Sequence, residues 1–185
     1  SSKDTTANAH LIMRLDRTTS CRRDVRVSRF GIQSSASRRR EVSCRGAMIT
    51  TTQHHLQTTG QGDAHDITSL VVREVSASGL LSGVVTISVV GSTAALTTIE
   101  YEPGAVADLN RLLNKLAPKA GQYAHHERWG DDNGSSHVRA ALLGPSLTLP
   151  FDQQQLLVGR WQQVILLECD TRPRRRPFVI QVMGE

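Results

Sequence analysis

A series of short apolar segments that starts close to Met48 restricts the fold more than any other feature of this sequence. Six of the segments have the length and the β-branched content of strands, with turn-forming residues between them. They cover residues 49–58, 83–90, 95–100, 146–150, 156–168 and 177–183. Two further segments have apolar residues at helical spacing, and they predict helices over residues 67–78 and 105–117. Strands therefore outnumber helices.

The order of these elements predicts a single mixed α+β domain. Because the helices do not alternate regularly with the strands, mostly antiparallel pairing is favoured. We expect a β-sandwich with two main helices packed against it, and 185 residues are enough to build its core. No apolar run approaches the roughly 18 residues of a membrane-spanning helix. The cysteines (Cys21, Cys44 and Cys169) follow no paired spacing, which fits a reducing compartment and predicts a cytoplasmic protein.

The net charge of +5 is distributed unevenly along the chain. Residues 1–47 hold eleven Lys or Arg and four Asp or Glu, whereas residues 48–185 hold eleven basic and thirteen acidic side chains. Because the second part carries no basic excess, a nucleic-acid-binding face is not expected there. Residues 1–47 show no strand or helix period, so we expect this segment to be disordered and the domain to span residues 48–185.

Three interpretations of residues 1–47 are open. An Arg- and Ser-rich, acid-poor composition is typical of a transit peptide, which would direct import into an organelle. The same composition suits a basic arm that contacts an anionic partner. The third interpretation is a stretch upstream of a true start at Met48. We favour the third, because the patterned segments begin close to that residue.

The stretch HHERWGDDNGSSH, residues 125–137, concentrates the groups that transfer protons or bind metals. The letters DDNG are typical of a turn, and Ser135 or Ser136 can cap a short helix over residues 137–143. His137 would then lie in the first helical turn, where the helix dipole favours the neutral imidazole that metal binding requires. The spacing of His125 and His137 matches no standard zinc motif, and a solvated turn would explain either histidine alone. The whole cluster favours a site.

Three other groups are candidates for the same site. The turn GSTA, residues 91–94, could admit a phosphate, although a tight strand connection is the favoured explanation of this turn alone. Glu100 follows a buried run and could act as a ligand or base. Arg174 and Arg176 lie in DTRPRRRP and could clamp an anion, or could keep an exposed hairpin solvated. The sequence contains no GxSxG elbow, Walker loop, GxGxxG or HExxH motif.

Four stretches together resemble the YjbQ-like family, also called the secondary thiamine-phosphate synthase family. They are GDAHDIT, GSTAALTTIEYEPG, YAHHERWGDDNGSSHVRAALLGPSLTLP and GRWQQVILLECDTRPRRR, and the resemblance covers residues 48–185 in order. It implies a β-sandwich of jelly-roll type that assembles as a homotrimer, with sites near subunit boundaries. Gly91 and Ser135 stand where many members have a histidine. The family's site residues fall on Glu100, His125, Asp132, Asn133, His137, Trp161, Gln162, Arg174 and Arg176.

The resemblance also implies a reaction, the joining of a pyrimidine pyrophosphate to a thiazole phosphate with release of pyrophosphate. We expect a divalent metal, zinc first and magnesium as the alternative, held by His125 and His137 with Glu100 as third ligand. Two histidines, one carboxylate and an open position form a normal catalytic zinc site. An aspartate, His126 or a neighbouring subunit could supply the third ligand instead.

A small phosphorylated substrate is the expected partner of this site. We place its phosphate between Ser92 and Thr93, the start of the helix near Ser136, and one arginine of residues 172–176. Backbone N–H groups at a helix start attract anions, and a guanidinium can bind two phosphate oxygens. Two other functions stay open: a metal-dependent hydrolase, and a non-catalytic ligand-binding trimer.

Overall fold

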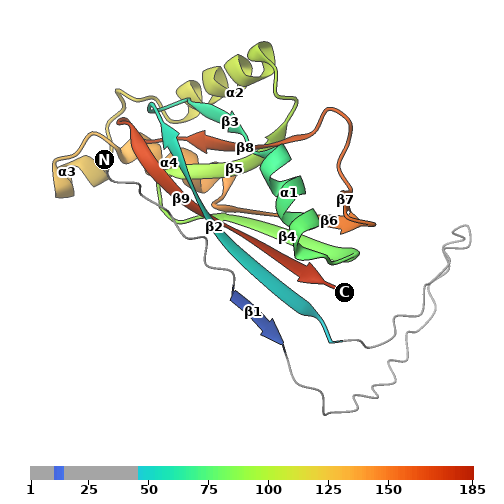
Figure 1. Cartoon of the computed structure of the whole chain (residues 1–185). Helices are drawn as coiled ribbons and strands as arrows, with labels where there is room; N and C mark the ends of the chain where they lie inside the picture. Colours follow the sequence, from blue (N-terminus) through green and yellow to red (C-terminus); the bar gives the residue numbers. More distant parts are fainter. Residues whose placement is uncertain (1–10, 15–45) are drawn as a thin grey trace, which may run out of the picture.

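The computed structural model describes residues 11–14 and 46–185, and in this part the chain forms two antiparallel sheets and four helices (Figure 1). The predictions made for residues 1–10 and 15–45 lie outside the described residues. Within the N-terminal segment, the four-residue strand β1 (Leu11–Arg14) pairs with the start of β2, where the sequence pattern predicts no element.

The larger sheet has the strand order β1-β2-β9-β4-β6-β7. Its long members β2 (Met48–Thr58) and β9 (Arg174–Gly184) pair along eleven residues each, and β9 also pairs with β4 (Ser82–Val89). Successive side chains of a strand point to opposite faces. Phe178, Ile180 and Val182 of β9 accordingly enter the core, while the residues between them are half-buried or exposed. The edge is completed by β6 (Ser146–Asp152) and β7 (Gln155–Leu156).

The smaller sheet has the order β3-β8-β5, formed by β3 (Ala64–Asp66), β8 (Gln163–Glu168) and β5 (Ala94–Ile99). One face packs against the larger sheet through Leu96 and Leu166. The opposite face carries Ala95 and Leu167 against the helices. Because both faces are covered, β8 reads as a nearly continuous apolar run rather than an alternating one.

The helices lie outside the sheets and follow the predicted apolar spacing. The helix α1 (Thr68–Ser78) places Val71 and Val75 in the main core. The helix α2 (Pro103–Leu116) begins at Glu102, whose carboxylate accepts hydrogen bonds from two backbone N–H groups of the first turn. Two shorter helices, α3 (Ala124–Trp129) and α4 (Gly134–Leu143), follow it, and α4 packs on β5.

The prediction of a mixed α+β fold with mostly antiparallel strands is confirmed. The strand orders define a twisted large sheet packed on a smaller one (Figure 1). They do not define the predicted jelly roll. The predicted strand over residues 156–168 is wrong in part: residues 157–162 form a loop between β7 and β8. Within the described residues, no helix combines the length and the apolar content that crossing a membrane requires.

Candidate functional site

The short helices α3 and α4 bring His125 and His137 together. Gly130 ends α3 in the left-handed conformation with a φ of 67°, and its N–H donates to the carbonyl of His126. Only residues 130–133 separate the two helices, so α4 folds back beside α3. The ring centroids of His125 and His137 are 4.4 Å apart with an angle of 50° between the ring planes.

A carboxylate completes this histidine pair. Oδ1 of Asp131 lies 3.4 Å from Nε2 of His125, and both side chains are partly exposed. In the described part of the chain, five buried side-chain polar atoms have no hydrogen-bond partner. Three of these belong to Asp131, Asn133 and Ser136, between the two histidines in sequence. Buried polar groups are normally satisfied, so this concentration indicates a place for a ligand or an ion.

A small cavity of about 490 Å³ connects this region to the predicted turn at residues 91–94. Ser92 and His137 both line it, together with small apolar residues such as Ala94 and Ala140. Thr93 is different: it is buried, and its hydroxyl faces a network of charges between the two sheets. Of the two hydroxyl residues predicted for the phosphate, only Ser92 therefore lines the cavity.

The centre of that network is the guanidinium of Arg176, which is buried between the sheets. Its Nε and Nη2 each donate to Glu168 at 2.6 Å, and Nη2 also donates to Oγ1 of Thr93 at 2.7 Å. Burial alone would lower the pKa of Arg176, but its hydrogen bonds to Glu168 and the negative charge there hold the pKa above the usual value. Arg176 is thus a permanent cation with a buried counter-ion.

Arg174 has a carboxylate partner as well. Its Nε and Nη2 both lie 2.8 Å from Oδ2 of Asp170. Burial would raise the pKa of Asp170, but the Arg174 guanidinium and the Thr93 hydroxyl hold it below its ordinary value. An anion would have to compete with these carboxylates for either arginine. Glu168 and Asp170 are not among the predicted site residues, although a carboxylate at the end of the apolar run of β8 is a signal for a buried cation.

Glu100, Trp161 and Gln162 lie at the other end of the smaller sheet. The strand β5 starts at the cavity with Ala94 and ends at Ile99, next to Glu100. At ~3.3 Å per residue, Glu100 is roughly 20 Å from the histidine end. Gln162 donates to Oγ1 of Thr98 near the same end, and Trp161 is exposed.

Glu100 is therefore not the third metal ligand within one chain. In the described part of the chain, no three His, Cys, Asp or Glu side chains gather in a way that could hold a metal ion. His125 and His137 could supply two imidazoles to a common ion, and Asp131 is the carboxylate beside them. Asp132, a further candidate, is exposed and pairs instead with His126, whose Nδ1 lies 3.2 Å from its Oδ1.

The chain is thus a small mixed α+β protein with two antiparallel sheets and a histidine pair beside a small cavity. The family model described as UPF0047 protein YjbQ-like matches residues 52–185, so the chain belongs to this family. The family resemblance seen in the sequence is thereby confirmed.

Relatives and solved structures agree with this assignment. The UPF0047 protein of Methanothermobacter thermautotrophicus is 31% identical over 137 residues, which is 74% of this chain and 94% of that protein. A YbjQ-like protein of unknown function from Sulfolobus solfataricus superposes with a TM-score of 0.67 at 27% identity, over 74% of this chain and 99% of that chain. A YjbQ/UPF0047-family protein from Clostridium acetobutylicum gives 0.63 at 30% identity, over 70% and 98%.

Proposed function

We propose that this chain is an enzyme that acts on small phosphorylated substrates at the histidine pair. The proposed reaction resembles thiamine-phosphate synthesis. The ring nitrogen of a thiazole phosphate attacks the methylene carbon of a pyrimidine pyrophosphate, the carbon–oxygen bond breaks, and pyrophosphate leaves. The observation that supports this proposal is the placement of His125 and His137, with ring centroids 4.4 Å apart, where His137 shares a cavity with Ser92.

The residues of this site suit a leaving group that gains negative charge. The hydroxyl of Ser92 can donate to a phosphate oxygen, and His137, in the first turn of α4, lines the same cavity. An imidazole of the pair can donate a further hydrogen bond, or a proton, to the departing oxygen. Asn133, whose side-chain oxygen is buried without a partner, could orient a substrate N–H group.

A divalent metal fits this donor set in part. His125 and His137 would each supply a ring nitrogen, and Asp131 or a second subunit would supply the carboxylate. This ligand set favours zinc, whereas magnesium would depend on carboxylate and phosphate oxygens. When bound, such an ion would neutralise charge on the leaving pyrophosphate.

The decisive experiment incubates the protein with the pyrimidine pyrophosphate and the thiazole phosphate, with and without a chelator, and measures thiamine phosphate and pyrophosphate. We expect stoichiometric formation of both products and a loss of rate with chelator. His125→Ala and His137→Ala should each lower the rate by about 100-fold or more, the range for proton-transfer groups. His55→Ala, an exposed histidine on β2, is the matched control.

A metal-dependent hydrolase is the second candidate. The pairing of Asp131 with His125 at 3.4 Å supports it, because a carboxylate beside an imidazole can help that ring to accept a proton from water. Turnover that consumes water and needs only one phosphorylated substrate would favour this candidate. Saturable binding without any turnover would contradict both enzymes and leave a ligand-binding protein.

A further inference from the structure

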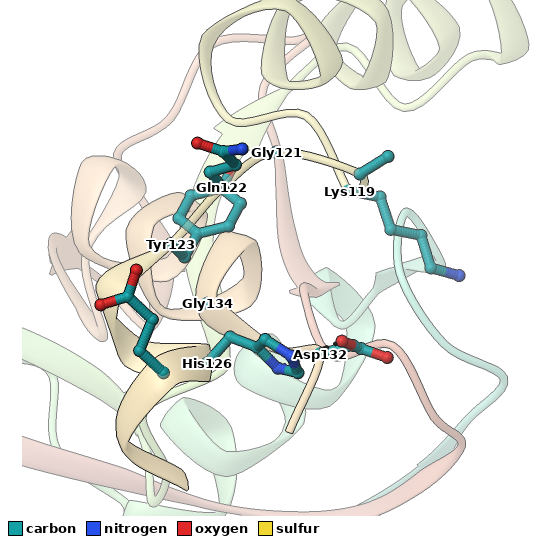
Figure 2. A pocket seen from close by; sticks show the side chains of 9 residues that line it. Lys119, Gly121, Gln122, Tyr123, His126, Asp132 and Gly134 are labelled. Atoms are coloured by element: carbon teal, nitrogen blue, oxygen red, sulfur yellow. Dashed lines mark ion pairs between the residues drawn. The ribbon is translucent and has the colours of Figure 1, made fainter. Parts of the chain in front are cut away.

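A second and larger cavity lies on the other side of α3. It has a volume of about 700 Å³ and is lined by the loop between α2 and α3, by α3 itself, by Asp132 and by the start of α4 (Figure 2). His125, His137 and Ser92 do not line it. Its volume falls within the range of about 300–1,000 Å³ that small-molecule sites occupy.

The aromatic wall of this cavity is held in place. The hydroxyl of Tyr123 donates to the carbonyl of Pro118 at 2.8 Å, which ties the ring to the loop. A Cβ added at Gly121 would lie 2.9 Å from Cε2 of Tyr123, and one added at Gly134 would collide with Cβ of the same residue. Both glycines are therefore required for the ring to occupy this position, and the wall exists before any ligand arrives.

His126 is oriented by its surroundings. Its Nδ1 lies 2.8 Å from the carbonyl oxygen of Asp131, which can only accept a hydrogen bond. Nδ1 therefore carries a proton, and in the neutral ring the lone pair is on Nε2. Figure 2 shows the His126 ring beside Asp132, among the side chains that line the cavity. A hydroxyl or N–H group of a ligand could donate to Nε2.

Positive charge lies at the opposite side of the cavity. Lys119 lies across the opening from Tyr123 (Figure 2), and it forms no ion pair among the described residues. The buried guanidinium of Arg139, which does not itself line the cavity, donates to the neutral acceptors Ala117 and Asn114. No carboxylate in the described part of the chain forms an ion pair with Arg139. Lys119 is therefore the cation that favours an anion at this side of the cavity.

We propose that this cavity is a second ligand site, which binds a small aromatic molecule with one carboxylate or phosphate group. The ring of the ligand packs on Tyr123, its anionic group contacts Lys119, and a hydroxyl or N–H group donates to His126. The carboxylates of Glu127 and Asp132, which also line the cavity, disfavour ligands with several anionic groups. This proposal does not depend on the reaction at the histidine pair.

The test uses 4-hydroxybenzoate and 4-hydroxyphenyl phosphate as probes and 4-hydroxybenzamide as the neutral control, with affinity measured by calorimetry and NMR titration. We expect saturable binding of at least one anionic probe, and binding of the benzamide that is weaker by about tenfold or more. The preferred probe identifies the anion as carboxylate or phosphate. Lys119→Gln should weaken the preferred probe by about tenfold or more, and Lys115→Gln, an exposed change on α2, should not.

Further variants test the other two contacts. His126→Leu should weaken the hydroxylated probes by about 2- to 10-fold, the range for one neutral hydrogen bond. Gly134→Ala should weaken them by displacing the Tyr123 ring. His125→Ala should leave probe binding unchanged, even where it abolishes the reaction proposed above. The proposal is overturned if no probe saturates the full chain at millimolar concentration, if Lys119→Gln binds like the parent, or if His125→Ala abolishes probe binding.

Discussion

At the scale of single residues, Arg176 stabilises the contact between the two sheets. Replacing Arg176 by Ala would leave Glu168 buried without its cation, and Glu168 is fully buried. Breaking a buried ion pair costs about 3–5 kcal/mol, so we expect Arg176→Ala to lower the free energy of unfolding by about this amount. Urea denaturation measures it. Arg175→Ala, an exposed neighbour on β9, should change stability by at most about 0.5 kcal/mol.

The opposite outcome would restore the role that the sequence suggested. If Arg176→Ala keeps the stability of the parent but loses affinity for phosphate esters, the arginine binds a ligand and Glu168 only positions it. The sequence could indicate that residues 170–177 are rich in arginine, but it could not show which of these arginines are buried. That depends on β9 facing β8 across the core, a long-range contact that no local pattern encodes.

The contrast between local patterns and long-range contacts also explains which other site residues could be placed from the sequence. The proximity of His125 and His137 could be predicted, because a turn signature between two histidines brings its flanks together. Glu100 could not be placed correctly, because a run of six strand residues says nothing about which end of the strand faces the histidines. The pairing of His126 with Asp132 depends on the short helix α3, which no pattern in the sequence predicts.

At the scale of elements, the predictable helices and strands are those long enough to repeat their apolar spacing several times. The helix predicted over residues 67–78 is observed as Thr68–Ser78, and its end at Gly79 has the left-handed conformation that glycine permits. β3 has three residues and α3 has six, which is too short to display a period. The segment 156–168 as a whole predicts a strand, yet Leu157 and Trp161 are exposed in the loop that residues 157–162 form.

The contact between α1 and β2 should make stability depend on pH. Nε2 of His54 lies 3.1 Å from Oγ1 of Thr52 and 3.5 Å from Oε1 of Glu74. Burial lowers the pKa of His54 below its ordinary value, although the Glu74 carboxylate acts in the opposite direction. Because the folded-state pKa is the lower one, the unfolded chain binds more protons in mild acid. Stability is therefore lost as the pH falls below about 6.5 towards the folded-state pKa, and is unaffected above that window.

Comparison of two histidine variants isolates this contribution. We expect the free energy of unfolding to fall less between pH 7.5 and pH 5.5 in His54→Gln than in the parent. His55→Gln, an exposed change on the same strand, should show the full decrease of the parent. An equal decrease in His54→Gln and the parent would mean that the acid sensitivity comes from other groups.

At the scale of the whole molecule, several large apolar side chains remain exposed. Trp161 and Leu157 are about three-fifths exposed in the loop before β8, and Leu142 is similarly exposed on α4. A contiguous exposed apolar patch often marks a contact between subunits, and Leu157 and Trp161 share one loop. It supports the proposal of a homotrimer, in which a second copy would cover these side chains. Such an assembly could also bring Glu100 of one subunit towards the histidine pair of another.

The assembly should not need residues 1–47. The buried hydrophobic residues of both cores lie in the part of the described chain that follows Met48. From the earlier segment, the described strand β1 pairs with one edge of β2 along four residues. We expect a chain shortened to residues 48–185 to unfold with nearly the same free energy as the full chain. Light scattering after gel filtration should give the mass of a trimer for both chains. If the short chain were monomeric while the full chain is trimeric, β1 or its neighbours would stabilise the subunit contact. Loss of β1 alone could not explain such a result, because an uncovered edge of β2 promotes association.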